Sequence, residues 1–165
     1  MAKLTSIDGA VAFDLALRGK FFDPFQQDLE WFEYEAVVEG RREPVPEGAI
    51  SLDEERRSVE GRINRKEFNE LLRGIDDLIA HSRALRFEPA DLNCYFEWSH
   101  ETPNVFLIVT WFDLALSSRS LEQRFPSAHA GYRFLCERDA LLGFRAEVEA
   151  EFLEGHGAPA SRSVH

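Results

Sequence analysis

Two stretches of the chain carry apolar residues at the three- and four-residue spacing of an amphipathic helix. The first stripe consists of Phe68, Leu71, Leu72, Ile75, Leu78 and Ile79. Asn64 precedes it as a helix N-cap, and Glu67 is placed to complete a capping box. The second stripe consists of Leu141, Leu142, Phe144, Val148 and Phe152, after Asp139 as the N-cap candidate. The pattern predicts helices over about 64–82 and 139–154.

Alternating apolar and polar residues, and short apolar runs between turn signals, predict β-strands elsewhere. These segments are Val11–Leu17, Leu29–Val38, Ser58–Ile63, Asp91–Trp98 and Val105–Leu116. The last is the most apolar run and favours a central strand. Tyr132–Cys136 is either a short final strand or the lead-in to the second helix. Strands followed by a helix occur twice, but no residue-level repeat accompanies this order, and we take the likeness to be accidental.

Together these elements predict one α+β domain over residues 1–154. We expect a mostly antiparallel sheet of about five to seven strands, with both helices packed on one face. Residues 155–165 are rich in Gly, Ala, Ser and Pro, and we expect a disordered tail. A chain of 165 residues with 44% hydrophobic residues needs no metal or disulfide to hold its core. Cys94 and Cys136 lie in apolar contexts, where buried, reduced thiols are expected.

The net charge of the chain limits the classes of partner that it can bind. Nineteen Lys and Arg against thirty Asp and Glu give a net charge of −11. A nucleic-acid binder needs a basic face for phosphates, so this balance argues against nucleic acid and against an anionic membrane surface. No apolar run reaches the roughly 18 residues of a transmembrane helix, and the first ten residues lack the pattern of a signal peptide. We therefore expect a soluble, cytoplasmic protein.

Common catalytic and metal motifs are absent from the sequence. It holds no glycine-rich phosphate loop, nucleophile elbow, His-Glu-x-x-His, paired Cys-x-x-Cys or calcium loop. We therefore assign no catalytic residue, no metal ligand and no cofactor. The sequence favours a binding protein over an enzyme.

Carboxylates interleave with large aromatic rings in two segments. These residues are Glu30, Trp31, Glu33 and Glu35 in the first, and Glu97, Trp98 and Glu101 in the second. Exposed rings would anchor a partner, and carboxylates would attract and pair with a basic one, so we hypothesise a binding face for a basic protein. In the alternative interpretation the rings belong to the core and the acids only keep the protein soluble.

A second hypothesis is a small-molecule-binding protein or small enzyme. Its pocket would lie between sheet and helices, lined by Trp31, Tyr95 and Trp111, with His100 or Asp113 as the polar group. Asp113 stands out because it lies between Phe112 and Leu114 on an apolar strand. A buried aspartate there would need a partner or a raised pKa. An outward-facing strand position is the alternative for this residue.

The order of features resembles the WapI-type immunity proteins found beside bacterial polymorphic toxins. It is carried by the aromatic segment Leu29–Phe32, the Glu-Phe-x-x-Leu-Leu of Glu67–Leu72, and Phe87-Glu88-Pro89 leading into Leu92–Trp98 and a strongly apolar strand. The resemblance spans roughly Val11 to Phe152 and rests on scaffold residues. It implies a small acidic α+β protein that neutralises a cognate toxin, often a nuclease, inside the producing cell. It assigns no functional residue.

Overall fold

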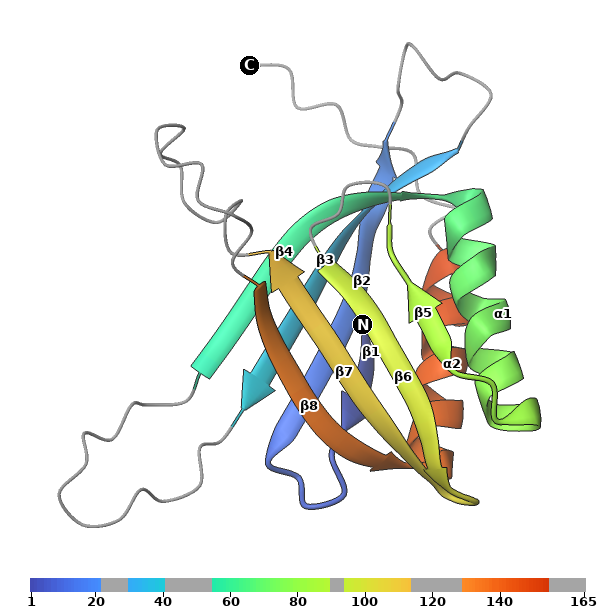
Figure 1. The fold of residues 1–165 in the computed structure, drawn as a ribbon. Helices are drawn as coiled ribbons and strands as arrows, with labels where there is room; N and C mark the ends of the chain where they lie inside the picture. The colour runs from blue at the N-terminus through green and yellow to red at the C-terminus, as the bar shows by residue number, and fades with distance from the viewer. Residues whose placement is uncertain (22–29, 41–54, 90–93, 114–128, 155–165) are drawn as a thin grey trace, which may run out of the picture.

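The computed structural model describes residues 1–21, 30–40, 55–89, 94–113 and 129–154 (Figure 1). In chain order its elements are β1 (Ala2–Thr5), β2 (Val11–Phe21), β3 (Trp31–Gly40), β4 (Glu55–Asn64), α1 (Arg65–His81), β5 (Leu85–Phe87), β6 (Cys94–Thr102), β7 (Val105–Asp113), β8 (His129–Glu137) and α2 (Arg138–Glu154). The expected tail at 155–165 and the end of the predicted strand at 114–116 lie outside the described residues.

The strands form two antiparallel sheets, ordered β1-β2-β3-β4 and β5-β6-β7-β8. The α+β class is therefore confirmed, while the expectation of one sheet of five to seven strands is wrong, because the described chain has eight strands in two sheets. Sequence reasoning missed β1 and β5. Both are short edge strands, and a run of three or four residues is too brief for alternation to stand out.

Both predicted helices are present within one or two residues of their expected ends. The N–H of Glu67 donates to the Asn64 side chain at 3.0 Å, and the N–H of Asn64 donates to the Glu67 carboxylate at 2.9 Å, which confirms the capping box. α1 ends where Ser82 adopts a left-handed conformation with φ of 56°. α2 follows β8 directly at Arg138, without a preceding loop.

The chain consists of two units with the same topology, each a four-stranded meander followed by a helix. In each unit the first helical N–H donates at 2.9 Å to the carbonyl just before the third strand: Arg65 to Glu30, and Arg138 to Asn104. The helices also bury residues at the same places counted from their first residues. These pairs are Phe68 and Leu141, Leu71 and Phe144, Ile75 and Val148, and Ile79 and Phe152. The likeness of the two halves in sequence order is thus a shared architecture in the structure.

Each helix packs against the first two strands of the other unit as well as against its own. α1 contacts β5 and β6, and α2 contacts β1 and β2. The helices run along one side of the two sheets (Figure 1). They also contact each other, with the rings of Phe68 and Phe152 stacked at 4.1 Å between centroids. Arg145 of α2 donates to both carboxylate oxygens of Asp76 in α1, at 2.8 and 2.9 Å.

The inner faces of both sheets and the apolar sides of both helices meet in one core. Phe13 of the first unit lies at its centre, with its ring 5.4 Å from Phe96 and 6.2 Å from Trp98 of the second. Phe144 of α2 packs on the same ring at 5.8 Å. Because aromatic rings of both units interlock here, neither unit has a core of its own.

Side chains of α2 also protect the edge of the first sheet. The carboxylate of Glu147 accepts the N–H of Lys3 at 3.0 Å, and that of Glu151 accepts the N–H of Leu17 at 3.1 Å. On the edge strand β8, the carbonyl of Leu135 accepts the N–H of Ile7 at 2.9 Å. Backbone groups at sheet edges that would otherwise be unpaired are therefore satisfied within the chain.

Gly61 provides a test of how tightly the first sheet is packed. A Cβ at this position would lie 2.6 Å from the hydroxyl of the buried Tyr34 and 2.7 Å from its ring carbon. We expect Gly61→Ala to lower the free energy of unfolding by about 1–3 kcal/mol, because the ring must move within a filled core. Urea unfolding measures the change.

Gly143 in α2 is the matched control, since a Cβ there meets nothing within 4 Å. Gly143→Ala should instead stabilise the protein, by up to about 1 kcal/mol from helix propensity. Equal effects of the two substitutions would contradict the close approach of Tyr34 to Gly61.

Candidate protein-binding face

The acidic residues predicted on β3 lie on the outer face of the first sheet, where basic side chains pair with them. Glu35 forms an ion pair with Arg18. Glu30, just before the strand, lies 2.5 Å from the ammonium of Lys20 and accepts a hydrogen bond from Arg65 at 2.6 Å. Lys20 and then Arg65 lower the pKa of Glu30. The carboxylates of Glu30 and Glu35 on this face are therefore paired with basic side chains and do not form a bare acidic patch.

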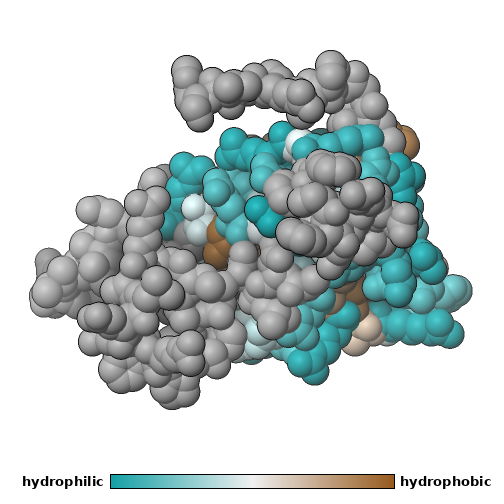
Figure 2. Space-filling view, turned by 90° about the horizontal axis from the view of Figure 1, so that it is seen from above, coloured by the Kyte–Doolittle hydropathy of each residue, from teal (hydrophilic) through white to brown (hydrophobic). Residues whose placement is uncertain are grey.

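Glu33 is exposed on the same face and lies opposite Arg62 of β4 in the strand register. Farther along the strand, Glu39 pairs with Arg56 at 3.2 Å. Glu33 and Glu39 thus lie opposite basic residues of β4, whereas Glu35 lies opposite Glu60 and pairs with Arg18 of β2 instead. Seen from above, hydrophilic residues dominate the described surface (Figure 2).

Two of the aromatic anchors expected at the surface are buried, Trp98 in the core and Trp31 on the outer side of β3 that also carries Glu33 and Glu35. Trp98 is 1% exposed and packs on Phe13, Phe96 and Phe144, and Trp31 is 8% exposed. Neither ring has the exposure expected of an anchor, and the alternative interpretation, in which the ring belongs to the core, describes Trp98 but not Trp31. On β6, residues alternate between core and surface, which separates Trp98 from its neighbour Glu97. Glu101 lies exposed near the β6–β7 turn.

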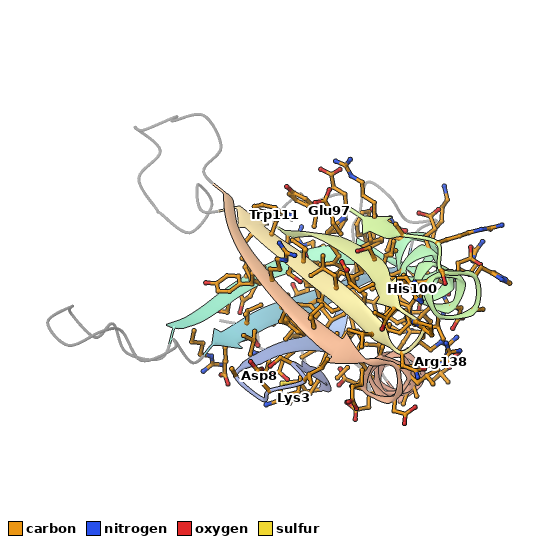
Figure 3. The ribbon with its side chains drawn as sticks, turned by 60° about the horizontal axis from the view of Figure 1, so that its bottom comes forward. Lys3, Asp8, Glu97, His100, Trp111 and Arg138 are labelled. Carbon is orange, nitrogen blue, oxygen red and sulfur yellow. The ribbon has the colours of Figure 1, made fainter. Side chains whose placement is uncertain are left out.

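The residues of the hypothetical small-molecule pocket do not surround a common space. Trp31 belongs to the first sheet, whereas Trp111 lies on the outer face of the second. His100 is near the other end of β6, with its ring 5.7 Å from that of Phe106 (Figure 3). Asp113 ends β7, with its backbone paired to His129, and its side chain lies outside the described part of the chain.

One cavity among the described residues is small and apolar. It is lined by residues of both sheets and α1, and the volume open to the centre of a water molecule is about 10 Å³. This is room for about one water. Within the lining, the Tyr34 hydroxyl lies 3.5 Å from the sulfur of Cys94. Burial raises the pKa of the Cys94 and Cys136 thiols to about 12, so both are neutral and unreactive as nucleophiles.

The outer face of the second sheet is chemically different from that of the first. On β7, Phe106, Ile108 and Phe112 face the core, and the alternate residues between them face outward. We call the outward set the β7 face: Tyr95 and Glu97 on β6, Val105, Leu107, Val109 and Trp111 on β7, and Arg133 and Leu135 on β8. Val105, Leu107, Val109 and Trp111 are half-buried, and Leu135 is 43% exposed. An uncovered sheet side ordinarily carries polar residues, so an apolar central strand here indicates a contact surface.

At one end of the β7 face, two aromatic rings and a carboxylate form a cluster. Tyr95 and Trp111 are cross-strand neighbours, stacked with centroids 5.8 Å apart. The indole N–H of Trp111 donates to Glu97 at 3.0 Å (Figure 3). Arg86 of β5 lies 4.0 Å from the other carboxylate oxygen. The carboxylate is thus held in one orientation at the surface.

The structure therefore brings Glu97 of one hypothesis together with Trp111 of the other. Sequence reasoning did not single out Leu107, Val109 and Leu135. The sequence did carry a signal for this face, because along Val105–Phe112 apolar residues occupy positions that face both sides of the strand. A strand in an antiparallel sheet with one open side needs only one apolar parity.

On the opposite sheet, Asp14 is a buried carboxylate. It is 5% exposed, and its Oδ1 atom accepts no hydrogen bond from the described residues. Burial raises the pKa of Asp14, and the nearby charge of Lys3 opposes this only in part. Its ionised form is therefore disfavoured in the folded state.

No family model, curated protein or solved structure matches this chain. Neither of the described helices is long and apolar enough to cross a membrane. Among the described residues, no group of His, Cys, Asp and Glu could hold a metal ion. The functional inference consequently rests on the geometry of the β7 face.

Asp14 generates a pH-dependent prediction. The pKa of Asp14 is raised in the folded state, so the folded protein holds the Asp14 proton more tightly than the unfolded chain does. The free energy of unfolding of the wild type therefore falls, relative to that of Asp14→Asn, as the pH rises from the unfolded-state pKa of about 3.9 through the folded-state pKa. The difference in the free energy of unfolding should be constant below this window, grow across it and level off above it. Urea unfolding at a series of pH values measures it, and a difference that stays flat between acid and neutral pH would contradict the prediction.

Proposed function

We propose that this chain is an acidic binding protein that neutralises a basic protein partner, in the manner of the immunity proteins it resembles in sequence. The observation that carries this proposal is the β7 face, where an apolar strand, a stacked aromatic pair and a fixed carboxylate share one open sheet surface. Protein interfaces combine an apolar, aromatic centre with charged groups around it. Such a partner would be met inside the producing cell, so the proposed location is the cytoplasm.

Glu97 gives this surface a preference for a cation. Because the Trp111 indole holds the carboxylate in place, a Lys or Arg of the partner loses less free energy in ordering it. The net charge of −11 supplies long-range attraction to a basic protein. Attraction of this kind mainly increases the association rate and weakens as salt is added.

The charges around β3 are already paired within the chain, which makes this face a weaker candidate for the contact surface. Glu35 and Glu30 already have basic neighbours, and a partner would have to displace Arg18, Lys20 or Arg65 to bind them. Contact through that face would therefore exchange one ion pair for another, with little net gain. Glu97 also has a basic neighbour, but Arg86 lies 4.0 Å away, farther than the partners of Glu30 at 2.5 and 2.6 Å. We accordingly move the proposed contact surface from β3 to Glu97 and the strand beside it.

The alternative function, a small-molecule-binding protein or small enzyme, has less support. The described cavity has room for about one water, whereas ligand pockets are usually several hundred Å³. The two thiols are neutral. Of the proposed pocket residues, Tyr95 and Trp111 stack on an open sheet face, whereas Trp31 belongs to the other sheet. No specific observation on the described residues favours this alternative.

Co-expression tests the proposed function. The probe is a basic protein that this chain captures from the lysate of its own host, placed under an inducible promoter in a host that lacks both. We expect its expression to stop growth and co-expression of this chain to restore it. The purified pair should associate, with an on-rate that falls by about tenfold or more between low and high salt. Growth arrest that persists with this chain present at full level would overturn the proposal.

A further inference from the structure

The two units provide an internal comparison for the outward side of their third strands. β3 and β7 each begin directly after the carbonyl that accepts the first N–H of their helix. Counted from that carbonyl, Glu33 corresponds to Leu107 and Glu35 to Val109. The first unit folds with carboxylates at both places. The architecture therefore does not require Leu107 and Val109 to be apolar, and a reason outside folding must be sought.

The apolar residues of β7 form a column along the strand. Its members are the alternate residues Val105, Leu107, Val109 and Trp111. At about 3.3 Å per residue, the column is about 20 Å long. Tyr95 widens it beside Trp111, and Leu135 widens it beside Leu107.

The position of β7 limits how a partner can contact it. β7 lies between β6 and β8, so its backbone N–H and C=O groups are used in two ladders. A partner cannot join this face as an added strand and must contact it with side chains alone. An amphipathic helix presents one straight apolar stripe, and about 13 residues of helix span 20 Å. Its turns repeat about every 5.4 Å and alternate strand residues about every 6.6 Å, so nearly four helical turns lie along the four residues of the column.

Opposite charges flank the column at its middle. In the strand register, Val109 lies between Glu97 on β6 and Arg133 on β8. A helix placed along β7 would therefore meet a carboxylate on one side and a guanidinium on the other. The complement at this point is a helix with a basic residue beside Glu97 and an acidic residue beside Arg133. At the start of the column, the exposed Glu137 of β8 lies opposite Val105 and would favour a second basic residue of the helix.

We infer that the β7 face is a docking site for a basic amphipathic helix of the partner, laid along β7 with a Lys or Arg directed at Glu97. This inference rests on the proposed function for the identity of the partner. The orientation follows from the two flanking charges, and the overall basic character of the helix follows from the net charge of −11. The stacked Tyr95 and Trp111 mark one end of the site.

A phage-displayed random peptide library, long enough for four helical turns, tests the site without the cognate partner. Peptides selected on the wild-type chain should carry apolar residues at helical spacing with Lys or Arg on one side, and should gain helicity on binding by circular dichroism. On the double variant Leu107→Glu and Val109→Glu, affinity should fall by about tenfold or more. Glu97→Lys should reverse the preference and select acidic residues at that flank.

The first unit supplies the matched control. Glu33→Lys with Glu35→Lys alters the corresponding places of β3 and should leave peptide affinity unchanged. The Leu107 and Val109 double variant should keep its circular dichroism and urea midpoint, since the first unit folds with glutamates there. Peptides that bind this variant as tightly as wild type, that bind without gaining helix, or that ignore Glu97→Lys would overturn the docking site.

Failure of the proposed function has a different signature. If selected peptides behave as expected but co-expression does not restore growth, the docking site stands and the neutralising role is wrong. If co-expression restores growth equally with wild type and with the Leu107 and Val109 double variant, the neutralising role stands and the docking site is wrong.

Discussion

The constraint on which the rest of this structure depends is the exchange of helices between its two units. Each helix follows directly from its own last strand yet covers the first two strands of the other unit. Phe68 and Phe152 stack where the helices meet, and Arg145 joins Asp76 across the same contact. Because neither sheet can bury its inner face without the other unit's helix, the two units form one core and are expected to fold together.

The same arrangement leaves the outer faces of the sheets as the variable part of the molecule. Inner residues such as Phe13 and Phe106 are fixed by packing, whereas the exposed residues of the outer faces are under no such constraint. The first unit uses this freedom for paired charges, for example Glu35 with Arg18. The second unit places Leu107 and Val109 at the corresponding positions. The two units thus share the core residues that folding requires and differ in the outward residues that binding would use.

In the proposed function, the β7 face is the surface that recognises the partner. Its carboxylate, Glu97, is already oriented by an indole N–H and stands beside stacked rings, so a partner would meet a preformed polar contact next to apolar area. The interior gives less support for a small-molecule or catalytic site, because its thiols are neutral and its described cavity has room for about one water. The net negative charge would act at longer range, by increasing the rate of encounter with a basic protein.

The sequence by itself determined the local features of this protein. The helix at Arg65–His81, its capping box at Asn64 and the longer strands follow from periodicity and from side chains a few residues apart. Only the tertiary structure decided which parity of each strand faces the core, because that depends on the sheet packed against it. It buried Trp98, neutralised Glu35 with Arg18, and brought Glu97 to Trp111 across two strands. These contacts join residues distant in sequence, which no local pattern specifies.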